Sequence, residues 1–459
     1  MRYFILASMG LTGMIFTSCT TYQPQPLEAA TRQIQWESRR LNDPGLGEFL
    51  AFYNEAVVDG SWWSLSRLTL AALYFNPELD VARAQRAEMV AEQHSAETRP
   101  NPTLTFAPGY NQDTGAVVSP WILDYALNFP IAWSGQRRSR RAEAQAQFDA
   151  SDLALAATAW RVKSQVRQAL VDLHAAEARL LVAREQAPVG ERAVTLMQQQ
   201  VDVGELANWE ASPLRNRWQQ VQLERRSREL AVTEARSRLA EAMGMSAAAL
   251  EGVALSFADL MPPIPSIDWS TARGQAVQNR LELRMALAEY EATQAALQVE
   301  VARQYPGLNL GPGYQLDQGE GKWTLGINLA LPVFDHNRGP IEAAEARRTA
   351  QAARFAVRQQ KILAEVDRAS AGYATALANV AAVETLHHDR VDQLAVWQAR
   401  ADVGEVSPLE LAIAAWDLTE SQRMELDVRI AAEEALGRLE DAIQKPLGWP
   451  DATWRESPR

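Results

Sequence analysis

The sequence predicts a mainly α-helical protein with a small β part, in which long helical hairpins carry four membrane-crossing strands. Residues 136–203 and 341–403 are rich in Ala, Gln, Arg, Glu and Leu, which are strong helix formers. Residues 121–130 and 323–332 instead alternate between two side-chain faces, as a strand does when one face meets an apolar medium. Both features occur twice, about 200 residues apart, so the chain contains an internal repeat.

The first residues predict export and lipidation. An apolar run, 3–16, is too short to span a bilayer, so residues 1–18 are expected to form a secretory signal peptide. The segment ends in Ser18-Cys19, which resembles the lipobox of bacterial lipoproteins, where the Cys is acylated, for example by palmitate. An incidental thiol near a cleavage site is the alternative. Thr20 follows, where Asp would favour retention at the inner membrane, so the outer membrane is the expected location.

Composition excludes several classes of protein and structure. The formal net charge is −12, which argues against nucleic acid as a partner because phosphates require a basic face. Cys19 is the single cysteine, so no disulfide can form within the chain. No run approaches 18 apolar residues, and any membrane span is therefore expected to consist of strands.

Two β-hairpins are expected, at residues 103–130 and 307–332. Strands of about ten residues suit a tilted crossing of an outer membrane, and Trp121 and Trp323 are expected at the membrane interface. The alternative is an edge piece of a soluble sheet. Four strands cannot close a barrel alone, and open edges in lipid leave amides unpaired, so other copies of the chain must complete it.

The hairpins divide the chain into segments. Residues 19–62 are expected to form a lipid-anchored N-terminal part, and two structural repeats follow. The repeats are 63–260, with a long helical hairpin at 136–244, and 261–445, with its counterpart at 340–443. Residues 446–459 are expected to be a loose tail. At 1.5 Å per residue, each long helix is a rod of about 100 Å that needs neighbours along its length, as in a coiled coil.

The helical hairpins end in one repeated motif, Asp-Val-Gly-Glu, at 202–205 and 402–405. A capping box at Ser407 and Glu410 is expected to start the second return helix, with Pro408 at its first position.

The first copy is less regular than the second. Asn208 is the expected cap, with Glu210 behind it, and Pro213 suggests a restart at Ser212. Pro188, together with Gly190, predicts a kink or a short break in the preceding helix.

Taken together, these residues resemble the outer membrane efflux family, the TolC-like channels, and especially the lipidated branch that works with resistance-nodulation-division (RND) pumps. The resemblance covers essentially the whole mature chain. It rests on the lipobox at Cys19, the helix motifs at 76–79 and 279–283, the paired hairpins, the strand exit at 331–334 and the two Val-Gly-Glu tips. In that family, three chains form one twelve-stranded barrel, which a twelve-helix periplasmic tunnel continues.

The resemblance implies partners and site residues. Val203, Gly204, Val403 and Gly404 would contact a periplasmic adaptor protein, although plain helix-turn geometry explains them equally. Glu210 and Glu410 would form acidic rings around the pore and favour cations, while the capping box is the structural alternative for Glu410. Polar links that close the tips in some relatives have no match here, because Ala401 and Val406 occupy the neighbouring positions.

Neither catalysis nor a cofactor is expected. The chain has five scattered histidines, and His387 and His388 are adjacent, so on a helix they point about 100° apart and make a poor metal pair. Four arginines follow the first hairpin and are expected to form either a solvated collar or a contact with lipid headgroups. They are Arg137, Arg138, Arg140 and Arg141.

The favoured function is a homotrimeric exit duct in the outer membrane. It would passively conduct small toxic compounds or metal ions from a periplasmic adaptor and an RND-type inner-membrane pump. The alternatives are the channel of a type I protein secretion system and a structural lipoprotein that spans the periplasm without a pore.

Overall fold

The computed structural model describes residues 20–55, 62–112, 118–131, 135–260, 269–305 and 307–445. The expected signal peptide, Cys19 and the tail 446–459 lie outside the described residues. The chain divides into two units, residues 1–40 and 41–459. The first unit contains helix α2 (Ala29–Glu37), which has no buried residue. All other elements belong to the second unit.

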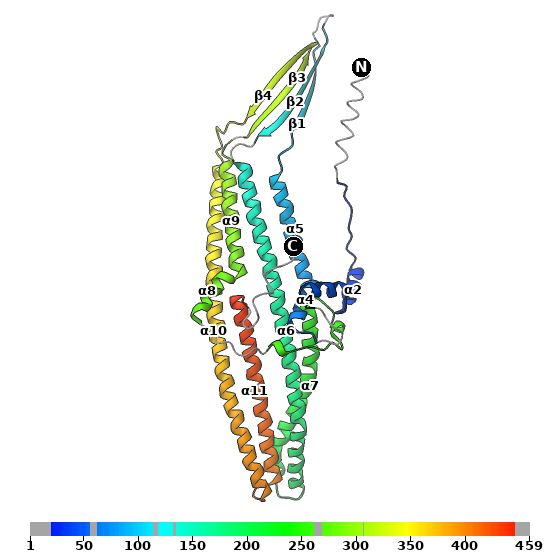
Figure 1. Ribbon diagram of the computed structural model, residues 1–459, viewed down its shortest axis with the longest axis vertical. Coiled ribbons are helices and arrows are strands. Elements are labelled where there is room, and N and C mark those ends of the chain that lie inside the picture. The colour runs from blue at the N-terminus through cyan, green and yellow to red at the C-terminus, as the bar shows by residue number, and fades with distance from the viewer. Residues whose placement is uncertain are drawn as a thin grey trace. The chain divides into compact units, whose positions relative to one another are not determined.

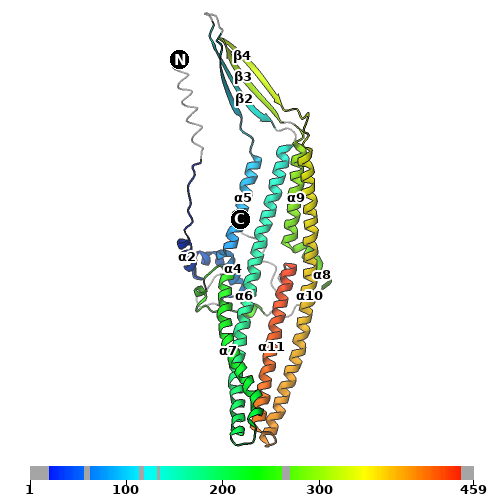
Figure 2. The same ribbon diagram turned by 180° about the vertical axis from the view of Figure 1, so that it is seen from behind.

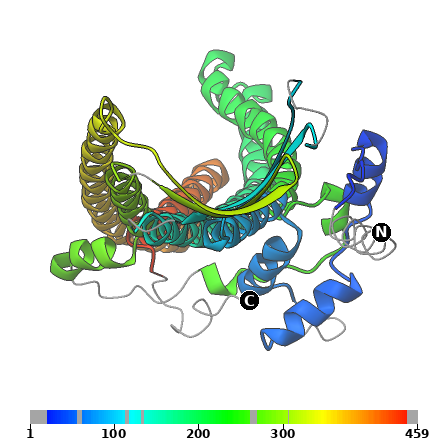
Figure 3. The same ribbon diagram turned by 90° about the horizontal axis from the view of Figure 1, so that it is seen from above.

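The strands of the second unit form one antiparallel sheet in the order β1-β2-β3-β4. The sheet is a single curved layer (Figure 3). Its strands are β1 (Thr103–Tyr110), β2 (Trp121–Ile131), β3 (Leu308–Asp317) and β4 (Glu320–Leu329). Strands β2 and β3 join the two repeats, so β1 and β4 are the edges of this sheet.

Both β-hairpins have the same register. Tyr110 pairs with Trp121 in the first, and Tyr314 pairs with Trp323 in the second. Because side chains alternate between the faces of a strand, each Trp shares its face with the paired Tyr. The repeat that is visible in the sequence is therefore also a repeat of strand pairing.

Two long helical hairpins run side by side from the sheet (Figures 1 and 2). The first consists of α6 (Gln136–Asp202) and α7 (Asn208–Ala242), and the second of α10 (Arg338–Asp402) and α11 (Pro408–Ile443). Helix α11 packs against α6 as well as against α10. Each hairpin turns at a glycine with positive φ, Gly204 at 79° and Gly404 at 77°, a conformation that other residues adopt at a cost.

Shorter helices lie beside the long ones. They are α3 (Pro44–Phe52), α4 (Leu65–Phe75), α5 (Pro77–Glu97), α8 (Trp269–Asn279) and α9 (Leu281–Ala302), with the short 3₁₀ turns η1 (Ala247–Leu250) and η2 (Ala258–Leu260). Asn76 caps α5 and donates a hydrogen bond to the carbonyl of Ala242, at the end of α7. Arg280 occupies the equivalent place in the second repeat and donates to the carbonyl of Ala442. Each return helix is thus held at its end by the motif that precedes α5 or α9.

Three local expectations need correction. Helix α6 continues through Pro188, so the break that was one of the two expected outcomes there does not occur; buried contacts on both sides of the proline compensate for its missing N–H. Helix α7 likewise continues through Pro213 and does not restart at Ser212. Its N-cap is Ala207 rather than Asn208, because the Glu210 carboxylate accepts a hydrogen bond from the Ala207 N–H at 3.1 Å.

Candidate membrane surface and helical tips

One face of the sheet exposes large apolar side chains. Trp121 is 52% exposed and Trp323 is 81% exposed. The ring centroid of Trp121 lies 5.2 Å from that of Tyr110, and the ring centroid of Trp323 lies 5.0 Å from that of Tyr314. Phe106 stacks on Tyr125 on the same face, at 4.9 Å. An exposed aromatic surface of this extent on a sheet with two open edges indicates contact with lipid or with other chains.

No helix in the described part of the chain is both long enough and apolar enough to cross a membrane.

The tips of the two helical hairpins are exposed and nearly identical. Val203 and Val403 are each 71% exposed, and each precedes the glycine that turns the chain. An added Cβ at Gly204 or Gly404 would meet nothing within 4 Å, so their positive φ, and not crowding, selects glycine. At the second tip, Arg400 Nε lies 3.2 Å from Glu405 Oε2. The tips thus offer two small apolar surfaces, each with charged neighbours.

Both candidate acidic-ring residues cap helices. Glu410 accepts a hydrogen bond from the Ser407 N–H at 2.9 Å, and the Glu410 N–H donates to Ser407 Oγ at 3.2 Å, which confirms the expected capping box. The hydrogen bond from the Ser407 N–H lowers the pKa of the Glu410 carboxyl. Glu210 bonds the Ala207 N–H in the same way. Both glutamates are exposed, so capping leaves their negative charges open to solvent.

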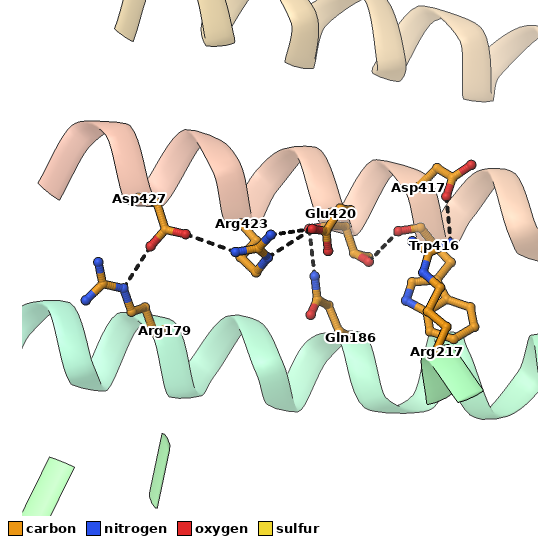
Figure 4. Close-up of polar contacts among 9 residues, drawn as sticks. Arg179, Gln186, Arg217, Trp416, Asp417, Glu420, Arg423 and Asp427 are labelled. Carbon is orange, nitrogen blue, oxygen red and sulfur yellow. Dashed lines mark hydrogen bonds and ion pairs between the residues drawn. The ribbon is translucent and has the colours of Figure 1, made fainter. Parts of the chain in front are cut away.

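A polar contact joins the two helical hairpins through α7 and α11 (Figure 4). Arg217 of α7 donates to Asp417 of α11 at 2.9 Å, and its guanidinium carbon lies 4.3 Å from the centre of the Trp416 ring. The Trp416 side chain is 1% exposed. An added Cβ at Gly190 of α6 would come within 2.9 Å of Trp218 and 3.2 Å of Trp416. Gly190 therefore provides the space in which the two tryptophans meet.

A second group of contacts lies farther along α6 and α11 (Figure 4). Arg179 Nε lies 2.8 Å from Asp427, and the other carboxylate oxygen of Asp427 lies 3.1 Å from Arg423. Arg423 also donates to Glu420. Gln186 donates to the Thr419 carbonyl at 3.0 Å. Polar contacts thus join the two helical hairpins along several turns of α6 and α11.

Buried charges lie where α6 meets the end of α11. Arg167 Nε is 3.4 Å from Glu440, and Asp441 accepts hydrogen bonds from Ser164 and, at 3.2 Å, from Trp160. Burial lowers the pKa of Lys163 to about 8 and raises the pKa of Glu433 to about 7. Burial also lowers the pKa of His174, which packs on Phe257.

No group of three or more His, Cys, Asp or Glu side chains that could hold a metal ion occurs among the described residues. His387 instead contacts Ser421 Oγ at 3.0 Å, and its other ring nitrogen lies 3.8 Å from Glu425. His388 lies 3.7 Å from Asp392 on the same helix. These imidazoles have local polar partners.

Comparison with known proteins gives the family. The sequence pattern of the outer membrane efflux protein family matches residues 69–245 and 272–443, which together make up most of the chain. The chain belongs to this family. As an outer membrane efflux protein, it resembles the cobalt-zinc-cadmium resistance protein CzcC of Cupriavidus metallidurans, with 24% identity over 224 residues. That match covers 48% of this chain and 52% of CzcC, so it spans about half the length of this relative.

Solved structures share the fold of this efflux protein. CusC, described for its transmembrane channel formation, aligns with a TM-score of 0.68 and 17% identity over 94% of this chain and 100% of CusC. VceC, an outer membrane protein from Vibrio cholerae, aligns with a TM-score of 0.67 and 18% identity over 83% of this chain and 96% of VceC.

Two features of the contact between the helical hairpins of this efflux protein were not predicted from the sequence. The Arg217–Asp417 pair was not expected, although the two positions are 200 residues apart, which is also the spacing of the Val-Gly-Glu tips. The two positions are equivalent in the repeats, with a cation in one copy and an anion in the other. Gly190 was considered only as a helix breaker, because its role depends on two tryptophans that are distant in sequence.

Proposed function

We propose that this outer membrane efflux protein is the homotrimeric exit duct of a tripartite efflux system. The observation that supports this most directly is the sheet, which has an exposed aromatic face and two open edges, β1 and β4. Three copies would pair each β4 with the β1 of a neighbour and so leave no edge in the bilayer. Lipidation of Cys19, through the lipobox, would anchor each chain at the same membrane.

The periplasmic partners would act at the tips. Val203, Gly204, Val403 and Gly404 are the proposed contacts for an adaptor protein, since the two valines are exposed and the turns are built alike. An RND-type pump in the inner membrane would supply the energy. Three copies each of Glu210 and Glu410 would line the narrow end of the duct and favour cations.

The substrates would be small toxic compounds or metal ions. Similarity to a cobalt-zinc-cadmium resistance protein favours metal ions as cargo, and lipidation favours a pump partner over type I protein secretion. A structural lipoprotein without a pore is the remaining alternative. It does not explain the aromatic face of the sheet.

Reconstitution of the full, lipidated protein in a planar bilayer tests this function. The expected result is stepwise ion conductance from a species with the mass of three chains. A trimer that leaves the bilayer silent, or a folded monomer whose Trp121 and Trp323 are accessible to aqueous quenchers, would refute it.

A further inference from the structure

A basic pocket lies between α5 and α6, next to the sheet. It has a volume of about 600 Å³, and its lining includes three arginines of α6 and three polar residues at the end of α5. These residues are Arg137, Arg138, Arg141, Gln93, His94 and Glu97. Both helices belong to one chain, and α5 leads into the edge strand β1.

The cations of the pocket exceed the anions. Arg141 pairs with the Glu97 carboxylate at 2.7 Å, and Arg137 Nη2 donates to the Glu97 carbonyl at 2.7 Å. The Nε of Arg137 is buried and has no hydrogen-bond partner within the described part of the chain. Arg138 is exposed and forms no hydrogen bond or ion pair with a described residue. Three arginines against one glutamate leave a formal charge of +2.

The pocket lies just beyond the end of strand β2. Arg137 comes six residues after Ile131, the last residue of β2, and Phe129 and Ile131 are both exposed apolar side chains. A strand that crosses the bilayer therefore ends just before the arginine cluster. Arginine at such a boundary forms paired hydrogen bonds to phosphate, and basic clusters there attract anionic lipids.

Helix α5, which lines the pocket, also forms a polar contact with α4. Arg83, three turns before His94 and hence on the same face, donates to the carbonyl of Leu73 in α4 at 3.0 Å. Helix α4 packs on α6 as an outer layer over the long helices. Helix α5 thus connects the pocket to this layer.

We propose that the pocket binds the phosphate of an anionic phospholipid in the membrane leaflet that faces the helices. This proposal rests on the proposed function, because it requires the sheet to cross the membrane. Arg138 would provide the uncompensated charge, and Arg141 would share its guanidinium between Glu97 and phosphate. Each bound lipid would hold the start of α6 at a fixed depth below the sheet.

Native mass spectrometry of the full, lipidated protein tests the proposal, with phosphatidylglycerol and phosphatidylcholine as competing probes. The wild type should retain phosphatidylglycerol in preference, and R138Q/R141Q should lower that preference by about tenfold, since each arginine near an anionic surface is worth a severalfold change in binding. The double variant R192Q/R226Q removes the same charge from exposed helix positions and should behave as the wild type.

The outcomes separate the lipid site from the duct. A conducting trimer with no lipid preference, or an equal loss in both double variants, would overturn the lipid site and leave the duct intact. Release of bound phosphatidylglycerol by inorganic phosphate alone would indicate a general anion site and would also overturn it. A wild type that does not insert in any bilayer would remove both proposals together.

Discussion

Arg217 and Asp417 hold equivalent positions in the two repeats, yet they lie 2.9 Å apart as an ion pair. An ancestral pair of identical hairpins would have had the same residue at both places. The contact is therefore asymmetric within a repeated architecture, and it joins α7 to α11 near the tips.

Breaking this pair should loosen the contact between the two hairpins. The side chains are 34% and 43% exposed, so the pair is expected to contribute about 0.5–1 kcal/mol, with a similar contribution from Arg217 over Trp416. A double-mutant cycle of R217A and D417A, measured by thermal unfolding, should show coupling of that size. The charge swap R217D/D417R should recover part of it, and strictly additive effects would contradict the interaction.

Gly190 should tolerate no larger side chain. A methyl group there would contact the rings of Trp218 and Trp416, and overpacking of this kind costs about 1–3 kcal/mol. G190A should therefore lower Tm. Gly372 provides the control, because it lies within α10 and an added Cβ meets nothing within 4 Å, so G372A should leave Tm unchanged or raise it. Equal effects of the two changes would argue against crowding at Gly190.

Glu433 should make stability depend on pH. Its pKa is raised to about 7 because burial disfavours the carboxylate. Between the ordinary carboxyl pKa and about 7, the folded chain holds a proton that the unfolded chain has lost, so stability falls as pH rises through this window. E433Q should abolish this decrease in stability with pH. Above pH 7 its free energy of unfolding should exceed that of the wild type by about 1–2 kcal/mol.

The pH dependence of Tm would check this expectation. Arg167, Glu434 and Glu440 surround the site and remain in both proteins. Lys163 titrates at about 8, so the comparison should end below that pH. Parallel Tm profiles of the two proteins would count against a buried, protonated Glu433.

Glu410 should set cation preference if it lines the duct. The Ser407 N–H lowers its pKa, so the carboxylate stays ionised as pH falls below the usual range. E210Q/E410Q should reduce the preference for cations, as measured by reversal potentials across a salt gradient. E205Q/E405Q, at the same two tips, removes the same number of exposed charges per chain and is the control. An unchanged reversal potential in E210Q/E410Q would leave Glu410 as a helix cap alone.

Periodicity and repetition predicted the features that depend on local sequence. The capping box at Ser407 was confirmed because its geometry is set within four residues. The cap at Asn208 was wrong because Ala207, which has no polar side chain, takes the N-cap position with Glu210 as its partner. A break at Pro188 was wrong because a proline in isolation interrupts a helix, whereas packing of α6 against neighbours maintains it. Contacts such as Arg217–Asp417 depend on how the two repeats face each other, which no local pattern records.

The unequal edges of the sheet restrict how copies of the chain can join. When strand β1 of one chain meets β4 of the next, as proposed, every contact is head-to-tail. A row of chains then retains one free β1 and one free β4, however many members it has. Only closure into a ring satisfies the last pair of edges, and a partial ring in lipid is as incomplete as a single subunit.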